Sequence, residues 1–493
     1  MRRNFLLFLL FLILIISSLA CKAITGAFEL APVVQSNAPQ TLSIFDAHQS
    51  PTDVELDIPS AISSPIILPS LTPTLLPTLT QTDTPQPTTN PSSTTAPIHV
   101  TASPLQTAIF DELWRTVNDY YLYPDFNGLD WDSIYSEYLQ KIEAGLTDEA
   151  FYQALSEMIE RLGDNHSTFL SPKQADEEDT AAAGGSQYVG IGIVPEPLPE
   201  QKKATVLIVF PGSPAEIAGI KAHDSILAVN GQPIFDESGA HIDQLRGPEG
   251  SQVSVTVQSP GQQPRDLNIL RQRTGGAFPV PYQLLTTASG KRIGYIFLID
   301  FFDRNIGPGF QQALQVMTTG GPLDGLIIDN RYNSGGTTEV VLSVLDYLAN
   351  GPVGNFYWRG QNTPLVAAGK DTNGSQTTPL VVLVGKGSVS YGEIVSGVLR
   401  DIGRAYLVGE QTDGNVEVLT PYEFSDGSRA WIATQTFRPL NNPNLDWEQT
   451  GIVPDLNITS NWEQVTTETD PVILAALQYF NNLPASVSTT STP

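Results

Sequence analysis

The chain has little cysteine, histidine or positive charge, and each shortage excludes a class of protein. Its 493 residues include one cysteine, Cys21, so neither a disulfide framework nor a thiolate metal cluster can form. Lysine and arginine number 25 against 52 aspartates and glutamates, a formal net charge of -27. Binding to nucleic-acid phosphates needs a basic surface, so we expect no nucleic-acid partner. Only 5 histidines are present, which leaves few candidates for a site that uses imidazole.

The first 21 residues have the order of a secretory signal. Two arginines precede an apolar run over residues 5–16, and small residues follow up to Ala20. The run is too short to span about 30 Å of hydrocarbon. Cys21 follows directly, which resembles a bacterial lipoprotein processing site and predicts a lipid anchor on Cys21; the alternative is cleavage after Ala20 without lipid. Both export the chain, and we expect it at the cell envelope or extracellular face, anchored to the membrane surface.

Two segments have compositions typical of disorder. Residues 22–104 are rich in threonine, proline and serine, and residues 483–493 repeat this bias. Proline removes backbone donors, and the apolar surface is too small to offset the entropy of ordering. We interpret the first segment as a tether between anchor and folded part, and the second as a disordered tail.

Residues 105–185 are predicted to form an N-terminal helical domain. Apolar residues recur at helical spacing in three stretches that begin near residues 105, 130 and 147, and the third ends at Gly163. The loop that follows contains His166 and Ser167. A histidine in a loop can be structural or functional, and the needs of the remaining chain have to decide between the two.

Residues 186–273 have the pattern of short strands around one small helix. Alternating glycines in the run Gly190, Ile191, Gly192, Ile193 free backbone donors at the start of a strand. Together with a later turn and strand, this run resembles a PDZ domain. In such domains an extended peptide adds to a sheet edge while its carboxylate meets loop N–H groups, so the resemblance assigns peptide binding to these four residues. The alternative is a packing module without a ligand. Two histidines of this segment, His223 and His241, are expected at the surface.

Residues 279–482 alternate β-like and helix-like stretches, which predicts an α/β core with its site at strand-to-helix turns. One buried-strand pattern ends at Asp329 and precedes a turn with Gly335 and Gly336. A second leads into Ser390 and a helix. A hydroxyl at that position is exposed, and the first free N–H groups of the helix can face an anion.

Three segments, 329–336, 388–394 and 404–410, have the order and spacing found in the C-terminal processing peptidases, PDZ-containing serine proteases that include the tricorn-type enzymes. The chain resembles that family from about residue 105 to residue 458. The resemblance implies a multidomain α+β protein with a crotonase-like α/β core. It implies a nucleophile at Ser390 and oxyanion donors on the backbone of Tyr391 and of Gly335 or Gly336. Acylation and hydrolysis at such a site need neither a cofactor nor a metal ion.

The base for this serine is where the chain departs from the better-known branch of the family, which uses a lysine. That position is Asn415, and an amide cannot accept the proton at neutral pH. The tricorn-type branch resembles a Ser–His–Glu arrangement, which would fall on Ser390, His166 and Glu448. The predicted core contains no histidine, so His166 is the candidate base, with Glu448 to orient it and Ser167 in support.

The predicted function is that of an exported serine endopeptidase acting on protein or peptide substrates, unfolded or C-terminal segments, that the PDZ-like domain presents. Two rivals stay open. Asn415 fits a catalytically inactive peptide-binding protein, and one branch of the superfamily carries apolar ligands, although a carrier has no need of Ser390, His166 and Glu448 together. Lys386 is a weaker candidate base, because a lysine beside a strand end is usually solvated.

Overall fold

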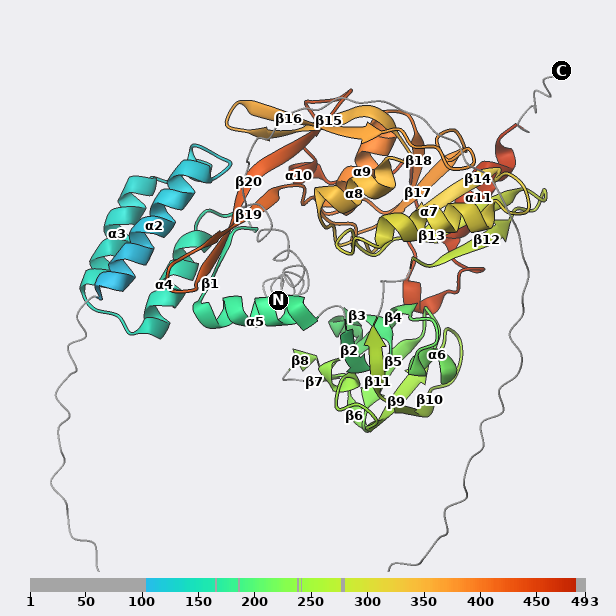
Figure 1. Cartoon of the computed structure of the whole chain (residues 1–493), viewed down its shortest axis with the longest axis horizontal. Coiled ribbons are helices and arrows are strands. Elements are labelled where there is room, and N and C mark those ends of the chain that lie inside the picture. Colours follow the sequence, from blue (N-terminus) through green and yellow to red (C-terminus); the bar gives the residue numbers. More distant parts are fainter. Residues whose placement is uncertain are drawn as a thin grey trace, which may run out of the picture. The chain divides into compact units, whose positions relative to one another are not determined.

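Three groups of elements follow one another along the chain: helices, a small β-rich unit, and a mixed core (Figure 1). The computed structural model describes residues 103–164, 166–184, 187–236, 239–240, 242–275 and 280–484. The predicted signal segment with Cys21, nearly all of the tether and of the tail, and His241 lie outside these residues. Within the described ranges, no helix is long and apolar enough to span a membrane.

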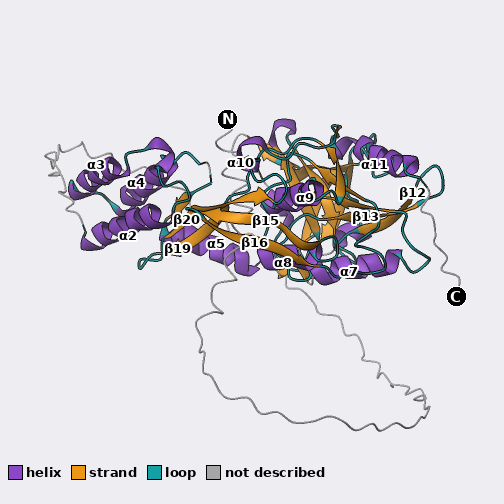
Figure 2. Cartoon of the chain, turned by 90° about the horizontal axis from the view of Figure 1, so that it is seen from above, coloured by secondary structure: helices purple, strands orange, loops and turns teal. Residues whose placement is uncertain are grey.

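Helices form at each of the three stretches with helical spacing: α2 (Pro104–Tyr120), α3 (Trp131–Glu143) and α4 (Asp148–Glu160). They begin at Ser103, Asp130 and Thr147, whose side chains accept a backbone N–H of the first turn. Figure 2 shows the three helices beside strands β19 (Val418–Glu423) and β20 (Arg429–Pro439). A further helix that the spacing did not predict is α5 (Pro172–Gly184).

The core of the helical unit is completed by strands from the far end of the chain. Ile432 and Ala433 of β20 are fully buried among the apolar side chains of α2, α3 and α4. Strand β1 (Thr168–Leu170) pairs antiparallel with β20, and Thr168 lies opposite Trp431. The segment that follows His166 is therefore fixed on the late strands.

The β-rich unit is a six-stranded sheet whose main path runs in the order β10, β9, β5, β4, β3. Its apolar core includes Ile191, Val206, Ile226 and Val255, each at most 1% exposed. Strand β3 lies at one edge, since β4 is its only neighbour among the described strands. The elements of this unit are β2 (Gln187–Gly190), β3 (Ile193–Leu198), η3 (Pro199–Gln201), β4 (Lys203–Val209), α6 (Pro214–Ile217), β5 (Ser225–Val229), β6 (Gln232–Pro233), β7 (Phe235–Asp236), β8 (Gly239–Ala240), η4 (Ile242–Leu245), β9 (Gln252–Gln258), β10 (Arg265–Leu270) and β11 (Gln272–Gly275).

The mixed core contains a second six-stranded sheet in the order β12, β13, β14, β17, β18, β21, in which every pair after the first is parallel. A separate sheet joins β1, β20, β15 and β16 in that order, with β19 beside β20. The remaining elements are β12 (Tyr282–Thr286), β13 (Arg292–Phe297), α7 (Ile306–Met317), β14 (Gly325–Asp329), α8 (Thr338–Leu345), β15 (Asn350–Trp358), β16 (Gln361–Ala368), β17 (Leu380–Val384), α9 (Tyr391–Asp401), β18 (Ala405–Gly409), α10 (Trp447–Thr450), β21 (Leu456–Asn457), η5 (Trp462–Gln464) and α11 (Pro471–Asn482).

Both faces of the parallel sheet are buried, which is why β14 and β17 are apolar along nearly their whole length. On one face, Leu326 and Ile328 pack against α7, α8 and α9. On the other, Ile327 packs against α11 and against Leu207 and Ile208 of the β-rich unit. The strand-to-helix turns after β14 and β17 therefore lie at the carboxyl edge of a covered sheet, where ligands bind in such folds.

The prediction that His223 lies at the surface is wrong. His223 is 4% exposed and stacks on Trp462 of η5 with ring centroids 3.9 Å apart. Its Nδ1 lies 2.8 Å from the carbonyl oxygen of Trp462, whose indole N–H donates to the carbonyl of Val206 at 3.0 Å. The partner lies 239 residues away in sequence, so no local pattern could indicate this packing.

Candidate active site

His166 and Glu448, predicted as base and orienting acid, are in direct contact. Nε2 of His166 lies 2.6 Å from Oε1 of Glu448, and both side chains are nearly buried. The histidine loop is held by Asp164, which accepts the N–H groups of His166 at 2.9 Å and of Ser167 at 2.8 Å. The Ser167 hydroxyl donates to Asp164 at 2.6 Å and accepts the N–H of Ala433 in β20 at 3.0 Å. Ser167 thus links the histidine loop to the late strands.

Glu448 is an ionised acceptor in a dry environment. Its second oxygen, Oε2, accepts the backbone N–H groups of Val416 at 2.7 Å and Glu417 at 3.1 Å. Burial alone would raise the pKa of Glu448, but the hydrogen bond and charge of His166 and these N–H groups outweigh it and lower the pKa. Burial likewise works against a charged His166, and Glu448 outweighs it, so the pKa of His166 is raised. The pair therefore favours a protonated imidazole facing a carboxylate.

Ser390 lies at a strained turn between β17 and α9. Its φ of 55° and ψ of -121° are unusual for a residue with a side chain, and its hydroxyl does not cap the helix that it precedes. Among the described residues, none forms a hydrogen bond with that hydroxyl, His166 included. A serine held at a strand-to-helix turn with an unused hydroxyl has the geometry of a nucleophile elbow.

The loop after β14 approaches Ser390 through Gly335. With φ of 90°, this glycine leaves no space for a side chain, since a Cβ would lie 2.6 Å from the Ser390 Cβ and 3.2 Å from the Tyr391 nitrogen. The Gly335 N–H donates to the Asn333 side chain at 2.9 Å. Gly336 lies opposite Phe301 in a parallel β-bridge. The Phe301 N–H donates to the Gly335 carbonyl, and the Thr337 N–H donates to the Phe301 carbonyl. In the described chain nothing accepts the N–H groups of Tyr391, which follows Ser390, and of Gly336, which follows the glycine packed against Ser390.

A buried ion network supports this loop. The Arg331 guanidinium donates to both oxygens of Asp329, at 2.9 and 2.6 Å, and to Asp470 at 2.7 Å. The Tyr295 hydroxyl also donates to Asp329, at 2.7 Å. Arg331 and its two acids are less than a tenth exposed, and the fork-like pairing fixes the direction of the chain entering residues 332–336.

Two further carboxyl groups, which the sequence did not single out for this role, surround Glu448. Glu417 is 5% exposed, accepts the Tyr123 hydroxyl, and has a second oxygen without a partner in the described chain. Burial, and next the charge of Glu448, raise the pKa of Glu417 to about 8. Glu393 of α9 is fully buried, accepts the Thr412 hydroxyl and the Gly414 N–H, and burial raises its pKa to about 7.

His166, Glu417 and Glu448 each offer one ligand atom, and these atoms all lie within 4.8 Å of one another, so the three could together hold a metal ion. Asn415, at the lysine position of the better-known branch, is half-buried next to Gly414. Lys386, the weaker candidate base, is exposed.

The four residues predicted to bind peptide lie in the β-rich unit, between β2 and β3. The carbonyls of Ile191 and Gly192 accept the N–H groups of Ala215 at 2.8 Å and Phe210 at 3.0 Å. Gly192, with φ of 83°, packs so closely on Ser213 that no side chain would fit. Within the described ranges, no group accepts the N–H groups of Ile191 and Gly192.

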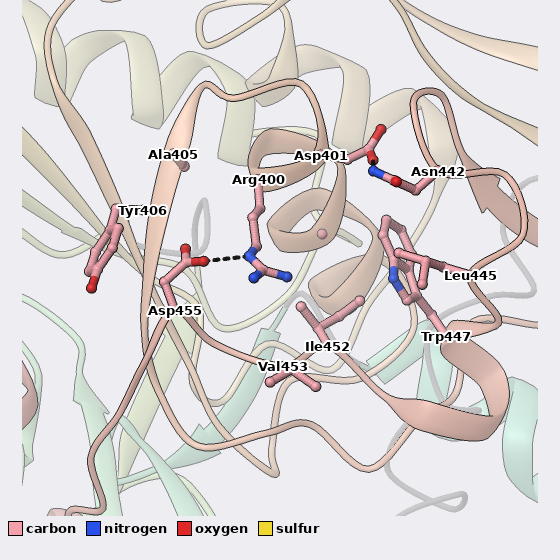
Figure 3. Close-up of a pocket in the computed structure, with 11 residues that line it drawn as sticks. Arg400, Asp401, Ala405, Tyr406, Asn442, Leu445, Trp447, Ile452, Val453 and Asp455 are labelled. Carbon is pink, nitrogen blue, oxygen red and sulfur yellow. Dashed lines mark hydrogen bonds and ion pairs between the residues drawn. The ribbon is translucent and has the colours of Figure 1, made fainter.

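A cavity of about 460 Å³ lies apart from the predicted catalytic residues, none of which lines it (Figure 3). Arg400 at the C-terminal end of α9 and Trp447 of α10 line it. Arg400 forms an ion pair with Asp455 at 2.7 Å. Trp447 directly precedes Glu448, and Gly397 of α9 has no Cβ that would clash with its ring. This close packing of α10 on α9 sets Glu448 relative to the helix that Ser390 begins.

A serine at a strained strand-to-helix turn and a buried His–Glu pair are the kinds of groups that serine hydrolases use. Comparison with known families agrees. The model of peptidase family S41 matches residues 292–458, that of the PDZ domain residues 206–259, and that of the tricorn protease C1 domain residues 106–160.

Relatives that match about three quarters of the chain give the same result. A carboxyl-terminal-processing protease of Synechocystis sp. is 30% identical over 381 residues, which span 74% of this chain and 84% of that protein. One of Picosynechococcus sp. is 31% identical over 384 residues, spanning 74% and 87%. The solved structure of a photosystem II D1 C-terminal processing protease matches with a TM-score of 0.51 at 28% identity and covers 72% of this chain and 93% of its own. The chain belongs to peptidase family S41 and is a C-terminal processing serine protease with a PDZ domain. The predicted fold class is confirmed.

Proposed function

We propose that Ser390 attacks the scissile carbonyl, that His166 takes the serine proton and returns it to the leaving amine, and that Glu448 orients the imidazole and stabilises its charged form. Water then hydrolyses the ester on Ser390, with His166 again as base. The observation that carries this proposal is the 2.6 Å contact between His166 and Glu448, since the two residues are 282 positions apart. An imidazole held through Nε2 leaves Nδ1 for the serine proton.

The unused Ser390 hydroxyl is compatible with this role. In substrate-free enzymes the bond between nucleophile and base is often long and tightens only when substrate binds. The other described histidine, His223, is buried against Trp462, and Lys386 is exposed, so neither competes as a base.

We propose the N–H groups of Gly336 and Tyr391 as the oxyanion donors. The sequence left Gly335 and Gly336 as alternatives, and Gly335 already donates to Asn333. Removing one such donor typically lowers the rate by about 100- to 1000-fold.

We propose that the PDZ domain presents unfolded or C-terminal segments of protein substrates, with Gly190, Ile191, Gly192 and Ile193 around the terminal carboxylate. We also propose export and a lipid anchor on Cys21, with residues 22–104 as a tether at the cell envelope. The support for the anchor is the signal-like sequence before Cys21. Incorporation of labelled palmitate into the full chain, lost in Cys21→Ala, tests it; equal labelling of both would exclude it.

Cleavage of casein and of tailed peptides by the full chain tests the mechanism. Ser390→Ala and His166→Ala are expected to lose activity, whereas Asn415→Ala and the exposed control Lys386→Ala are expected to keep it. A fluorophosphonate probe is expected to label the wild type and not Ser390→Ala. Absence of both cleavage and labelling in the wild type, with retained binding of C-terminal peptides, would instead support the inactive peptide-binding protein.

A further inference from the structure

The edge strand of the PDZ domain contains two prolines, Pro195 and Pro197, at alternate positions of β3. One side of β3 is paired with β4 along the whole strand, from Ile193 opposite Val209 to Leu198 opposite Lys203. An added peptide strand would have to pair with the free side of β3, because β3 has no second neighbour among the described strands.

The register shows which backbone groups face that free side. The Gly192 carbonyl accepts the N–H of Phe210, the residue after β4, so the backbone of Gly192 faces toward β4. In a strand, N–H and C=O of one residue point to the same side and alternate along the chain. The pairing contains one β-bulge, and it lies in β4. Val194 pairs with Ile208 and Pro195 with Val206, so Leu207 is the extra residue. The backbone groups of β3 therefore keep alternating between its two sides. Pro195 and Pro197 therefore face outward, away from β4.

A strand that adds to an edge needs an N–H donor at every second residue of that edge, and proline has none. The outward positions of Pro195 and Pro197 keep their carbonyls but donate nothing. A peptide lying along β3 would leave its facing carbonyls without partners, and an unpaired carbonyl in an interface is unfavourable. Prolines at an edge are a known means of preventing strand addition.

We propose that this PDZ domain recognises the terminal carboxylate and the last residue of a substrate, without a β-ladder to the residues before them. This rests on the proposed role of the loop 190–193. The unused N–H groups of Ile191 and Gly192 hold the carboxylate, and Pro195 and Pro197 end the strand pairing before it extends. Selectivity then depends on the C-terminal residue, and the preceding chain stays free to enter the peptidase site.

The experiment measures binding of fluorescein-labelled alanine-rich peptides that end in valine, ten or three residues long, to the full chain with Ser390→Ala. The two lengths are expected to bind within about twofold of each other, and a C-terminal amide is expected to weaken both at least tenfold. Pro195→Val restores one N–H donor. It is expected to raise the affinity for the ten-residue peptide about fivefold, the ratio expected for one hydrogen bond, and to leave the affinity for the three-residue peptide unchanged. Pro199→Ala, in η3 beyond the strand, is the control and is expected to change neither.

The outcomes separate this inference from the proposed function. If the wild-type edge binds the ten-residue acid more than tenfold tighter than the three-residue acid, and Pro195→Val adds nothing, a ladder forms despite the prolines and the inference is wrong. If acid and amide bind equally, carboxylate capture itself fails, and PDZ presentation is lost together with the inference.

Discussion

Replacing Glu417 by glutamine is expected to change how stability depends on pH. Glu417 is 5% exposed and accepts the Tyr123 hydroxyl, while Glu448 lies close enough to disfavour a second charge. Burial and that charge raise the pKa of Glu417 from 4.5 to about 8, so the carboxyl is protonated in the folded chain at neutral pH. Glutamine has the shape of the protonated acid and cannot ionise.

The sign follows from proton binding. Between pH 4.5 and about 8 the folded chain keeps a proton that the unfolded chain has lost, so the free energy of unfolding falls as pH rises. Each pKa unit corresponds to about 1.4 kcal/mol, so the full interval corresponds to about 5 kcal/mol. Glu417→Gln removes this loss. The variant is expected to match the wild type near pH 4.5 and to exceed its unfolding free energy by several kcal/mol at pH 8.

Urea unfolding from pH 4.5 to pH 8.5 measures the difference directly. Glu200→Gln, the same change at an exposed position of η3, serves as the control and is expected to leave the profile unchanged. Parallel profiles for Glu417→Gln and the wild type would show that Glu417 ionises normally in the folded chain. The reasoning from burial and from the charge of Glu448 would then be wrong.

Three other changes test the site and its surroundings. Gly335→Ala is expected to lower kcat at least 100-fold in peptide cleavage, because the added Cβ would meet Ser390 and Tyr391; activity near the wild type would exclude close contact. Glu448→Gln is expected to lower kcat by about 10⁴-fold with little change in KM and with unchanged urea unfolding, since the imidazolium loses its counter-charge; a raised KM with kcat retained would show that Glu448 acts in substrate binding instead. Burial lowers the pKa of His223 below 6.5, so the contact with Trp462 is expected to weaken below that pH. The protection factors of amide hydrogen exchange in η5, each taken against the intrinsic rate at that pH, should then fall on acidification in the wild type and not in His223→Gln, and equal protection factors in both would refute this.

The parts of the fold that sequence could predict are those with local signals. Apolar spacing marked three helices, two of them with start signals at Asp130 and Thr147, and apolar runs marked β14 and β17. The strand-to-helix turn that contains Ser390 is a local pattern, but the choice of Ser390 as nucleophile came from the family resemblance. The pairing of His166 with Glu448 needed the family resemblance, since nothing local joins residues 282 positions apart.

The features that sequence could not predict depend on distant partners. Helix α5 has a weak apolar pattern, and its buried Glu178 is compensated by Arg429, 251 residues further along the chain. In the sequence Glu417 is an ordinary carboxylate beside a strand, and its contact with Tyr123, 294 residues earlier, is seen only in the structure. His223 differs from a surface histidine only because Trp462 covers it. Each of these side chains takes its character from burial, which arises only after the long-range strands have paired.

Burial also sets the charge of the carboxyl groups around Glu448. Glu393 and Glu417 lack sufficient donors, so burial raises their pKa values to about 7 and about 8 and they hold protons near neutrality. Glu448 accepts two backbone N–H groups and also pairs with His166, and its pKa is lowered. The hydrogen bond and charge of Glu448 are therefore the main influence that raises the pKa of His166 against burial. A lysine at position 415 would add a positive charge beside this pair and oppose protonation of His166, so Asn415 is consistent with a histidine base.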